Sequence, residues 1–298
     1  MVYGKDSMNL EIRCHLFGGI GNQIFQYATG FRVASLLDGI FVVDTRWLES
    51  QLPHIKSDIR TLQIYNPIGE ITRKSHGDLN LTYSKILSKL ASKDKRLGRF
   101  LHMYSKEFID LAEIQKYKNF VELRGYFQNS WSVEGALWDI PNFSLELKKK
   151  SNTLVNAIKS LEDNFVAIHI RRGDYLNKNS IHLILSSDYY KDAIRLVQAN
   201  SQEQIHFLIF SDDPNFAKYL IPSGVNYTMA EKFKLDPVEE MHLMSYASSF
   251  IIANSTFSFW PAISSLINPQ VIAPSNWFKS RTIDMAQLYP KHWDIIYT

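Results

Sequence analysis

The stretch "FVAIHIRRGDY", residues 165–175, joins an apolar run directly to a polar turn. Residues 165–170 are apolar enough to form a buried strand, and Arg171, Arg172 and Asp174 follow it without a break. In α/β proteins, ligands bind beyond the carboxyl ends of parallel strands, where turns of this kind lie. The stretch therefore predicts a strand inside a parallel sheet and a binding site at its end.

Three further segments repeat this order of a short apolar run, a polar or glycine-rich turn and a helical pattern. They are "EIRCHLFGGIGNQIFQYATGFRVASLL" (residues 11–37), "IHFLIFSDDPNFAKYL" (205–220) and "SFIIANSTFSFWPAISSLI" (249–267). Strands that alternate with helices predict parallel βαβ units and an α/β fold. All four polar turns are then expected at the carboxyl edge of a sheet.

The segment "LELKKKSNTLVNAIKS", residues 145–160, looks like a helix that leads from one α/β half to the next. It predicts two domains, residues 1–150 and 151–298. The first domain contains a lysine-rich stretch, about residues 70–118, which we expect to form a helical insertion. Charge runs usually form a solvated helix face. The alternative is attraction of these lysines to an anionic membrane surface.

The composition is that of a soluble globular protein. The chain has 298 residues, 45% hydrophobic and 21% charged, and its net charge of +3 is too small to predict a nucleic-acid partner. Cys14 is the single cysteine, so no intrachain disulfide can form, and no Cys/His cluster has the spacing of metal ligands. We find no secretory leader and no bilayer-spanning apolar run, so we expect a cytoplasmic protein.

The first polar turn is rich in glycine. Gly18, Gly19 and Gly21 lie between a predicted strand and a helix that begins near Asn22. Such glycines let a ligand approach the backbone, and the helix start offers N–H groups to an anion or a sugar hydroxyl. A purely structural tight turn explains the glycines equally well, and their spacing is not that of the dinucleotide-binding fingerprint.

The second turn raises the question of what partners its arginines. A strand period of two places His169 and Arg171 on one face and Arg172 on the other. A buried arginine needs a partner, because an unpaired charge out of water is very costly. Asp174 is one candidate, in a structural ion pair, and a phosphate is the other. We favour the phosphate, because one aspartate does not balance the positive charge of two arginines and a histidine.

The third turn, "FSDDPNF", separates two acidic residues by position. Asp213 precedes Pro214, so it is the expected N-cap of a helix with proline at its first position. Asp212 is not needed as a cap, and we expect it to face the ligand. An acceptor beside a phosphate site suits the N–H donors of a guanine ring.

The fourth turn places Asn254, Ser255 and Thr256 at a strand end before another helix. Hydroxyls and free N–H groups at a helix start form a second candidate phosphate site. A simple capping role for Ser255 or Thr256 is equally consistent with the sequence. We expect Pro261 within the first turn of this helix, where proline is tolerated.

Five motifs together resemble glycosyltransferase family 11, the α-1,2-fucosyltransferases of bacterial surface-polysaccharide synthesis. They are "GGIGNQIFQYA" (18–28), "LRGYFQNSW" (123–131), "HIRRGDY" (169–175), "FSDD" (210–213) and "IIANSTFSFW" (251–260). The resemblance spans about residues 13–280. The His-x-Arg-Arg-x-Asp core is also found in α-1,6- and protein O-fucosyltransferases, so it indicates fucosyl transfer more than linkage.

The resemblance implies a GT-B-like fold, with two Rossmann-like domains facing across a cleft. The implied reaction is inverting transfer of L-fucose from GDP-fucose, held mainly by residues 151–298, to O2 of a β-galactoside. The implied acceptor is a galactose-terminated oligosaccharide or a lipid-linked glycan of O-antigen synthesis, which would bring the protein to the inner membrane. No metal or other cofactor is implied, and the chain contains no Asp-x-Asp motif.

The resemblance also implies site residues. The implied donor-binding residues are Gly19, Gly21, Asn22, His169, Arg171, Arg172, Asp212, Ser255, Thr256 and Phe257. Arg171 would hold the β-phosphate during catalysis, and Asn22 would approach the fucose or that phosphate from the first domain. Asp174 is a candidate general base, or it orients an arginine.

On the acceptor side, the resemblance implies Tyr126, Gln128 and Trp260. Here the chain departs from the family pattern, since Phe259, Trp260 and Pro261 stand where Trp-Trp-Gly is usual. Alternative functions are transfer from a GDP-sugar with another linkage or acceptor, and nucleotide binding without catalysis. A lectin-like protein is the least supported, because it needs neither the arginines nor Asp212.

Overall fold

A computed structural model describes residues 10–45, 103–104, 109–117, 120–139, 150–161, 164–177, 182–199, 204–265, 267–279 and 288–298. These residues form two compact units, which we call unit 1 (residues up to 139) and unit 2 (residues from 150). The described residues of the two units are separated between residues 139 and 150, and the sequence predicted a boundary near 150. Most of the lysine-rich stretch predicted as a helical insertion lies outside the described residues.

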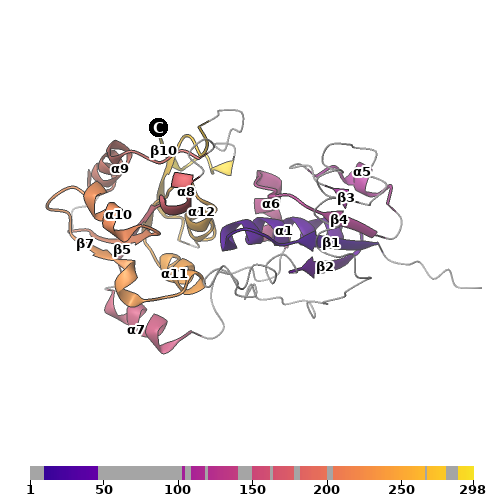
Figure 1. The fold of residues 1–298 in the computed structure, drawn as a ribbon, viewed down its shortest axis with the longest axis horizontal. Helices are drawn as coiled ribbons and strands as arrows, with labels where there is room; N and C mark the ends of the chain where they lie inside the picture. Colours follow the sequence, from indigo (N-terminus) through magenta and orange to yellow (C-terminus); the bar gives the residue numbers. More distant parts are fainter. Residues whose placement is uncertain are drawn as a thin grey trace, which may run out of the picture. The chain divides into compact units, whose positions relative to one another are not determined.

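Unit 1 contains a four-stranded parallel sheet with the order β2-β1-β4-β3 (Figure 1). The strands are β1 (Glu11–His15), β2 (Ile40–Asp44), β3 (Met103–Tyr104) and β4 (Phe120–Leu123). The helices are α1 (Ile20–Leu36), α5 (Leu111–Ile114) and α6 (Ser130–Glu134), which continues as the π-helical turn η1 (Gly135–Asp139). Alternate residues of β1, Ile12 and Cys14, pack with Val33 of α1 in the core.

Unit 2 contains a six-stranded parallel sheet with the order β10-β9-β8-β5-β6-β7. The strands are β5 (Phe165–Ile170), β6 (His206–Ser211), β7 (Tyr227–Met229), β8 (Ser249–Ile251), β9 (Gln270–Pro274) and β10 (Asp294–Ile296). The helices are α7 (Asn152–Ser160), α8 (Gly173–Asn177), α9 (Ser187–Ala199), α10 (Pro214–Leu220), α11 (Pro237–Met244) and α12 (Thr256–Ile263), with a 3-10 turn, η2 (Ala230–Phe233).

Strand β5 is the predicted core strand, and all six of its residues are buried. Parallel strands that are covered on both faces read as continuous apolar runs, which is why the stretch was recognisable in the sequence. One face of β5 packs with α9, whose Tyr189, Ala193 and Ile194 are buried in the same cluster. The prediction of an α/β fold with parallel sheets is confirmed.

Each sheet contains a point at which the strand order reverses. In unit 1, β1 has β2 on one side and β4 on the other, and in unit 2, β5 lies between β6 and β8. Open α/β sheets bind ligands at such topological switch points, outside the carboxyl ends of the strands. The order reverses between β1 and β4 in unit 1 and between β5 and β8 in unit 2. We call the carboxyl ends of β1 and its neighbours β2 and β4 switch point 1, and the carboxyl ends of β5 and its neighbours β6 and β8 switch point 2.

Two of the helix predictions can be compared with the structure. Asp213 is the N-cap of α10, where its side chain accepts the N–H of Phe216 and Pro214 takes the first helical position, as predicted. The prediction for Pro261 is wrong, because it lies inside α12 beyond the first turn. Proline there removes the N–H that would bond to Phe257, and α12 ends two residues later.

Candidate active site

Switch point 2 brings Arg171 and Asp212 together. Arg171 follows β5 and Asp212 follows β6, and Nη1 of the arginine lies 3.1 Å from Oδ2 of the aspartate. Oδ1 of Asp212 accepts the backbone N–H of Arg172 at 2.9 Å. A Cβ added to Gly173 would lie 2.8 Å from Asp212 Oδ2, so a larger residue there would displace this carboxylate. Asp212, predicted as a ligand acceptor, therefore also positions the turn after β5.

Arg172 is held by α10. Its Nη1 donates to Asp213 Oδ2 at 2.6 Å, and its guanidinium carbon lies 4.0 Å from the ring centroid of Phe216. The backbone N–H of Phe216 and the Arg172 guanidinium together hold the pKa of the Asp213 carboxyl below its ordinary value. The structure thus gives Arg172, a predicted donor ligand, a place in the scaffold.

The prediction of surplus positive charge after β5 is contradicted by the described residues. Each arginine forms an ion pair with an aspartate, Arg171 with Asp212 and Arg172 with Asp213. His169 is 4% exposed, and burial together with the charge of Arg171 lowers its pKa to about 3. The histidine is therefore neutral at pH 7, with Nδ1 2.8 Å from Ser258 Oγ.

Asp174 was predicted as an ion partner or as the general base. It lies in α8, but its side chain is outside the described residues. The ion partners that the structure gives the two arginines come instead from the turn after β6. Because β5 and β6 are neighbours in the sheet, their carboxyl ends bring these groups together over about 40 residues of sequence. This pairing could not be read from local spacing.

The start of α12 forms the other side of switch point 2. Ser255 is the N-cap, and its Oγ accepts the N–H of Phe257 at 3.3 Å, so the capping role is confirmed. Thr256 is the first helical residue and is partly exposed. The Phe257 ring lies 5.3 Å from that of His169. The N–H groups at a helix start attract anions, so this end of α12 and the Arg171 guanidinium both suit a phosphate.

Switch point 1 is formed by the glycine-rich turn and the turn after β4. Gly18 has φ +77°, a conformation that favours glycine, and Gly19 is the N-cap of α1, which therefore has no side-chain cap. Asn22 Oδ1 accepts a hydrogen bond of 2.8 Å from Gln128 Nε2. This hydrogen bond directly joins the glycine-rich motif (18–28), predicted to bind the donor, to the motif at residues 123–131, predicted to bind the acceptor.

A strained residue shapes the turn after β4. Phe127 is fully buried and has φ +52°, which is unusual for a residue with a bulky side chain. It stands between Gln128 and Tyr126, which is 44% exposed and makes an edge contact with Phe17 at 5.0 Å. Strain of this kind is often found at functional sites. Tyr126 and Gln128 lie in this one turn, and Gln128 contacts Asn22.

Trp260 does not fit its predicted role on the acceptor side. It is fully buried in unit 2, and its ring packs edge-on against Phe259 at 5.6 Å. A side chain without exposed surface cannot touch a sugar in this structure. The residues that follow Ser255 in the motif include both cap and core positions, and the sequence alone did not separate them.

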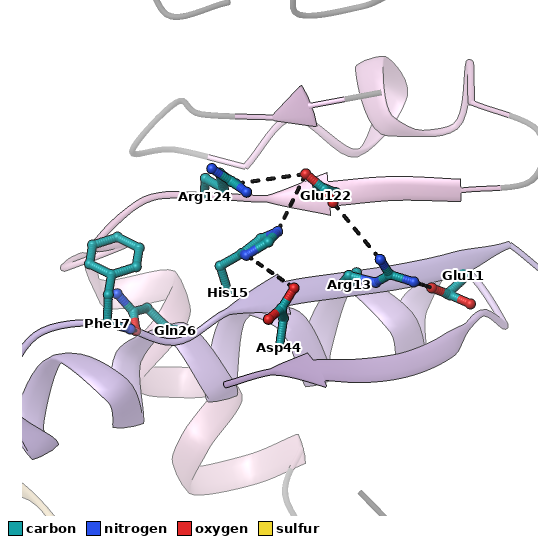
Figure 2. A network of polar contacts seen from close by, with 8 residues as sticks. All are labelled: Glu11, Arg13, His15, Phe17, Gln26, Asp44, Glu122 and Arg124. Atoms are coloured by element: carbon teal, nitrogen blue, oxygen red, sulfur yellow. Dashed lines mark hydrogen bonds and ion pairs between the residues drawn. The ribbon is translucent and has the colours of Figure 1, made fainter. Parts of the chain in front are cut away.

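Unit 1 contains a buried polar cluster that was not predicted from the sequence (Figure 2). His15 Nδ1 lies 3.4 Å from Asp44 Oδ2, and His15 Nε2 lies 3.4 Å from Glu122 Oε2. Arg13 Nη2 donates to Glu11 Oε1 at 2.6 Å. The signal was present in "EIRCH", where polar residues alternate with core residues, as expected for a strand with one polar face.

The cluster lies on the face of the sheet opposite α1 (Figure 2). Burial alone would raise the pKa of Glu122, but the hydrogen bond and charge of His15 and the charges of Arg124 and Arg13 outweigh it, and the pKa is below its ordinary value. Both ring nitrogens of His15 face carboxylates, so this histidine is not placed as an open general base. We regard the cluster as structural.

Comparison with known proteins identifies the family. The model of "Glycosyl transferase family 11" matches residues 4–297. The chain belongs to glycosyltransferase family 11. It is 26% identical to the O-antigen biosynthesis glycosyltransferase WbnK of Escherichia coli, over 88% of this chain and 93% of that protein.

A second relative of this family 11 member is an alpha-1,2-colitosyltransferase of E. coli, 28% identical over 93% of this chain and 96% of that protein. Among solved structures, a family 9 glycosyl transferase from Veillonella parvula superposes with a TM-score of 0.50 at 10% identity, covering 100% of this chain and 89% of that one. The fold is therefore GT-B-like, and the protein is a glycosyltransferase.

Neither a metal cluster nor a membrane-spanning helix is found among the described residues. They contain no group of three or more His, Cys, Asp or Glu side chains arranged to hold a metal ion. In the same part of the chain, no helix is both long and apolar enough to span a membrane.

Proposed function

We propose that this family 11 enzyme transfers L-fucose from GDP-fucose to O2 of a β-galactoside, with inversion and without a metal ion. The observation that carries the proposal is the arrangement at switch point 2, where Arg171 follows β5 and the start of α12 follows β8. The names of the two relatives support a role in O-antigen synthesis and a 1,2 linkage. The acceptor is then a galactose-terminated or lipid-linked glycan, handled in the cytoplasm at the membrane surface.

The donor is assigned to unit 2. As the glycosidic bond breaks, negative charge develops on the departing diphosphate, and a guanidinium already in place stabilises this charge more than that of the ground state. The Arg171 side chain is 30% exposed, so a ligand can reach it, while Asp212 keeps its guanidinium oriented. His169 is neutral and suits a hydrogen bond better than a charge interaction.

The acceptor is assigned to unit 1. The exposed ring of Tyr126 offers an apolar face to a sugar, and the amides of Asn22 and Gln128 can exchange hydrogen bonds with hydroxyls. Asp174 remains the candidate for the general base, because it follows Arg171 by three residues in the same turn. Trp260 has no part in this proposal.

The relative that is an alpha-1,2-colitosyltransferase favours one alternative, transfer of a different sugar through the same linkage. Both candidates require a nucleoside diphosphate at Arg171. They differ only in the glycosyl group that the site accepts. Competition between GDP-fucose and GDP-colitose in one assay separates them.

The test uses labelled GDP-fucose, a panel of β-galactosides and excess EDTA. Wild type is compared with Arg171→Ala and with Arg195→Ala, a control in the exposed Arg195–Asp192 pair on α9. We expect transfer to galactose O2 that EDTA does not diminish, that Arg171→Ala reduces on the order of 10²-fold or more, and that Arg195→Ala leaves intact. Wild type that binds GDP but transfers no fucose to any galactoside would refute the reaction and leave the nucleotide site standing.

A further inference from the structure

Tyr175 contacts both sides of switch point 2. It lies in α8 and is 7% exposed. The guanidinium carbon of Arg171 lies 5.6 Å from the centroid of its ring, within the range of a cation–π contact. Its hydroxyl donates to the backbone carbonyl of Asn254 at 2.8 Å. One side chain therefore joins the arginine after β5 to the residue just before the cap of α12.

The residue whose carbonyl accepts the Tyr175 hydroxyl is itself held in place. Asn254 is 1% exposed, and its Nδ2 donates to the carbonyls of Leu183 at 2.7 Å and Trp277 at 2.9 Å. The next residue, Ser255, caps α12. A hydrogen bond to the Asn254 carbonyl therefore fixes Tyr175 relative to the helix start.

The ring of Tyr175 is also held from the side. His182 stacks on it, with 4.2 Å between ring centroids and 11° between the planes, and Phe278 lies 5.4 Å from His182. A ring held by stacking, by a buried hydroxyl bond and by the surrounding core cannot turn freely. It gives the flexible Arg171 side chain a rigid surface.

We propose that Tyr175 is a positioning residue, which sets the distance between the Arg171 guanidinium and the first N–H groups of α12 and thereby matches both to the two phosphates of a nucleoside diphosphate. This inference rests on the proposed donor site. A diphosphate spans two groups, so its binding depends on the spacing of the groups that receive it. Small misplacements of such groups weaken binding and catalysis strongly. A single phosphate does not depend on that spacing.

The test compares Tyr175→Phe with Tyr189→Phe. Tyr189 is a matched control, because it is 2% exposed and its hydroxyl donates to the carbonyl of Ile252 at 2.6 Å, in the same loop that leads to Asn254. Each variant removes a buried hydroxyl that donates to a backbone carbonyl, and the Tyr189 hydroxyl has a second, longer contact of 3.3 Å with the carbonyl of Ile272. Only Tyr175→Phe alters a side chain that contacts Arg171. Tyr175→Leu removes the ring as well.

The affinities for GDP and GMP are measured by calorimetry, with melting temperatures alongside. We expect Tyr175→Phe to weaken GDP binding by about 3- to 10-fold and to change GMP binding less. Tyr175→Leu should weaken GDP binding further, and Tyr189→Phe should leave both affinities unchanged although its melting temperature falls at least as much as that of Tyr175→Phe.

Equal GDP affinity in Tyr175→Phe and Tyr189→Phe, with wild type binding GDP through Arg171, overturns the positioning role alone. Parallel losses for GDP and GMP also overturn it, because they indicate a general loss of structure. A wild type that binds no GDP overturns the proposed donor site and this inference with it. Tyr175→Phe differs from wild type by one oxygen atom, so the test does not depend on whether the leucine variant folds.

Discussion

The two switch points share a topology but differ in their chemistry. At switch point 2 the turns after β5 and β6 are joined by ion pairs, including that of Arg171 with Asp212. At switch point 1 the turns after β1 and β4 are joined by a hydrogen bond between two neutral amides, Gln128 and Asn22. A charged site suits a ligand whose charge grows during the reaction, and neutral amides suit hydroxyl groups. The difference supports a diphosphate in unit 2 and a sugar in unit 1.

Charge alone does not mark a functional site in this molecule. Arg13 and His15 of β1 are polar residues like those after β5, but both are buried on the face of the sheet. Both also lie beside carboxylates. Arg171 differs because it lies beyond a strand end and keeps part of its side chain exposed. Position relative to the strand ends separates the two cases.

The sharpest test of the comparison lies within switch point 2. Arg171→Ala should lower kcat/KM by about 10²- to 10³-fold, because it removes the charge that stabilises the leaving diphosphate. Arg172→Ala should lower it by less than about 10-fold, since Asp213 and Phe216 already hold that guanidinium. Steady-state rates with GDP-fucose give both values. Similar losses in the two variants would show that Arg172 also binds the donor.

The neutral histidine of switch point 2 should appear in the pH dependence of stability. Its folded pKa of about 3 lies below the ordinary value of 6.5, so acid protonates the unfolded chain first, and stability is lost as pH falls from 6.5 towards 3. Between pH 7 and pH 4 this loss is on the order of 3 kcal/mol.

His169→Asn keeps a polar atom near Ser258 Oγ and cannot take up this proton. The difference between the variant and wild type, from urea unfolding at both pH values, isolates the histidine. Identical pH slopes in the two proteins would show that His169 titrates normally.

At switch point 1 the two glycines before α1 should behave differently. Gly18→Ala places a Cβ at φ +77° and 3.0 Å from Asn22 Nδ2, so we expect a loss of about 1–2 kcal/mol in the free energy of unfolding. Gly19 has φ −71° and open space around its Cβ position, so Gly19→Ala should change stability by less than about 0.5 kcal/mol. If Gly19→Ala keeps its stability but loses activity, a ligand approaches that backbone. Equal destabilisation would contradict the strain argument.

The smallest expected effect concerns the amide pair. Gln128→Ala removes the hydrogen bond to Asn22 and should raise the KM for the acceptor about 3- to 10-fold. The affinity for GDP, measured by calorimetry, should not change, because switch point 2 lies in the other unit. A parallel loss of GDP affinity would mean that Asn22 serves the donor instead.

Much of the fold was predictable because it depends on local patterns. The buried strand at residues 165–170, the helix starts at Asp213 and Ser255 and the α/β class follow from apolar runs and capping residues within about ten positions. The four polar turns after β1, β5, β6 and β8 also lie at strand ends, as predicted. Pro261 and Trp260 were misplaced, because the motif around them does not show where the helix becomes core.

The sequence by itself determined which residues end the strands and start the helices, since steric preference and hydrophobic periodicity act on neighbouring residues. Only the tertiary structure decided which of these residues meet. Strand order placed Asp212 beside Arg171 and Gln128 beside Asn22, at separations for which the sequence carries no periodic signal. Burial then set the protonation of His169, because desolvation depends on the surrounding core rather than on the residue's neighbours in the chain.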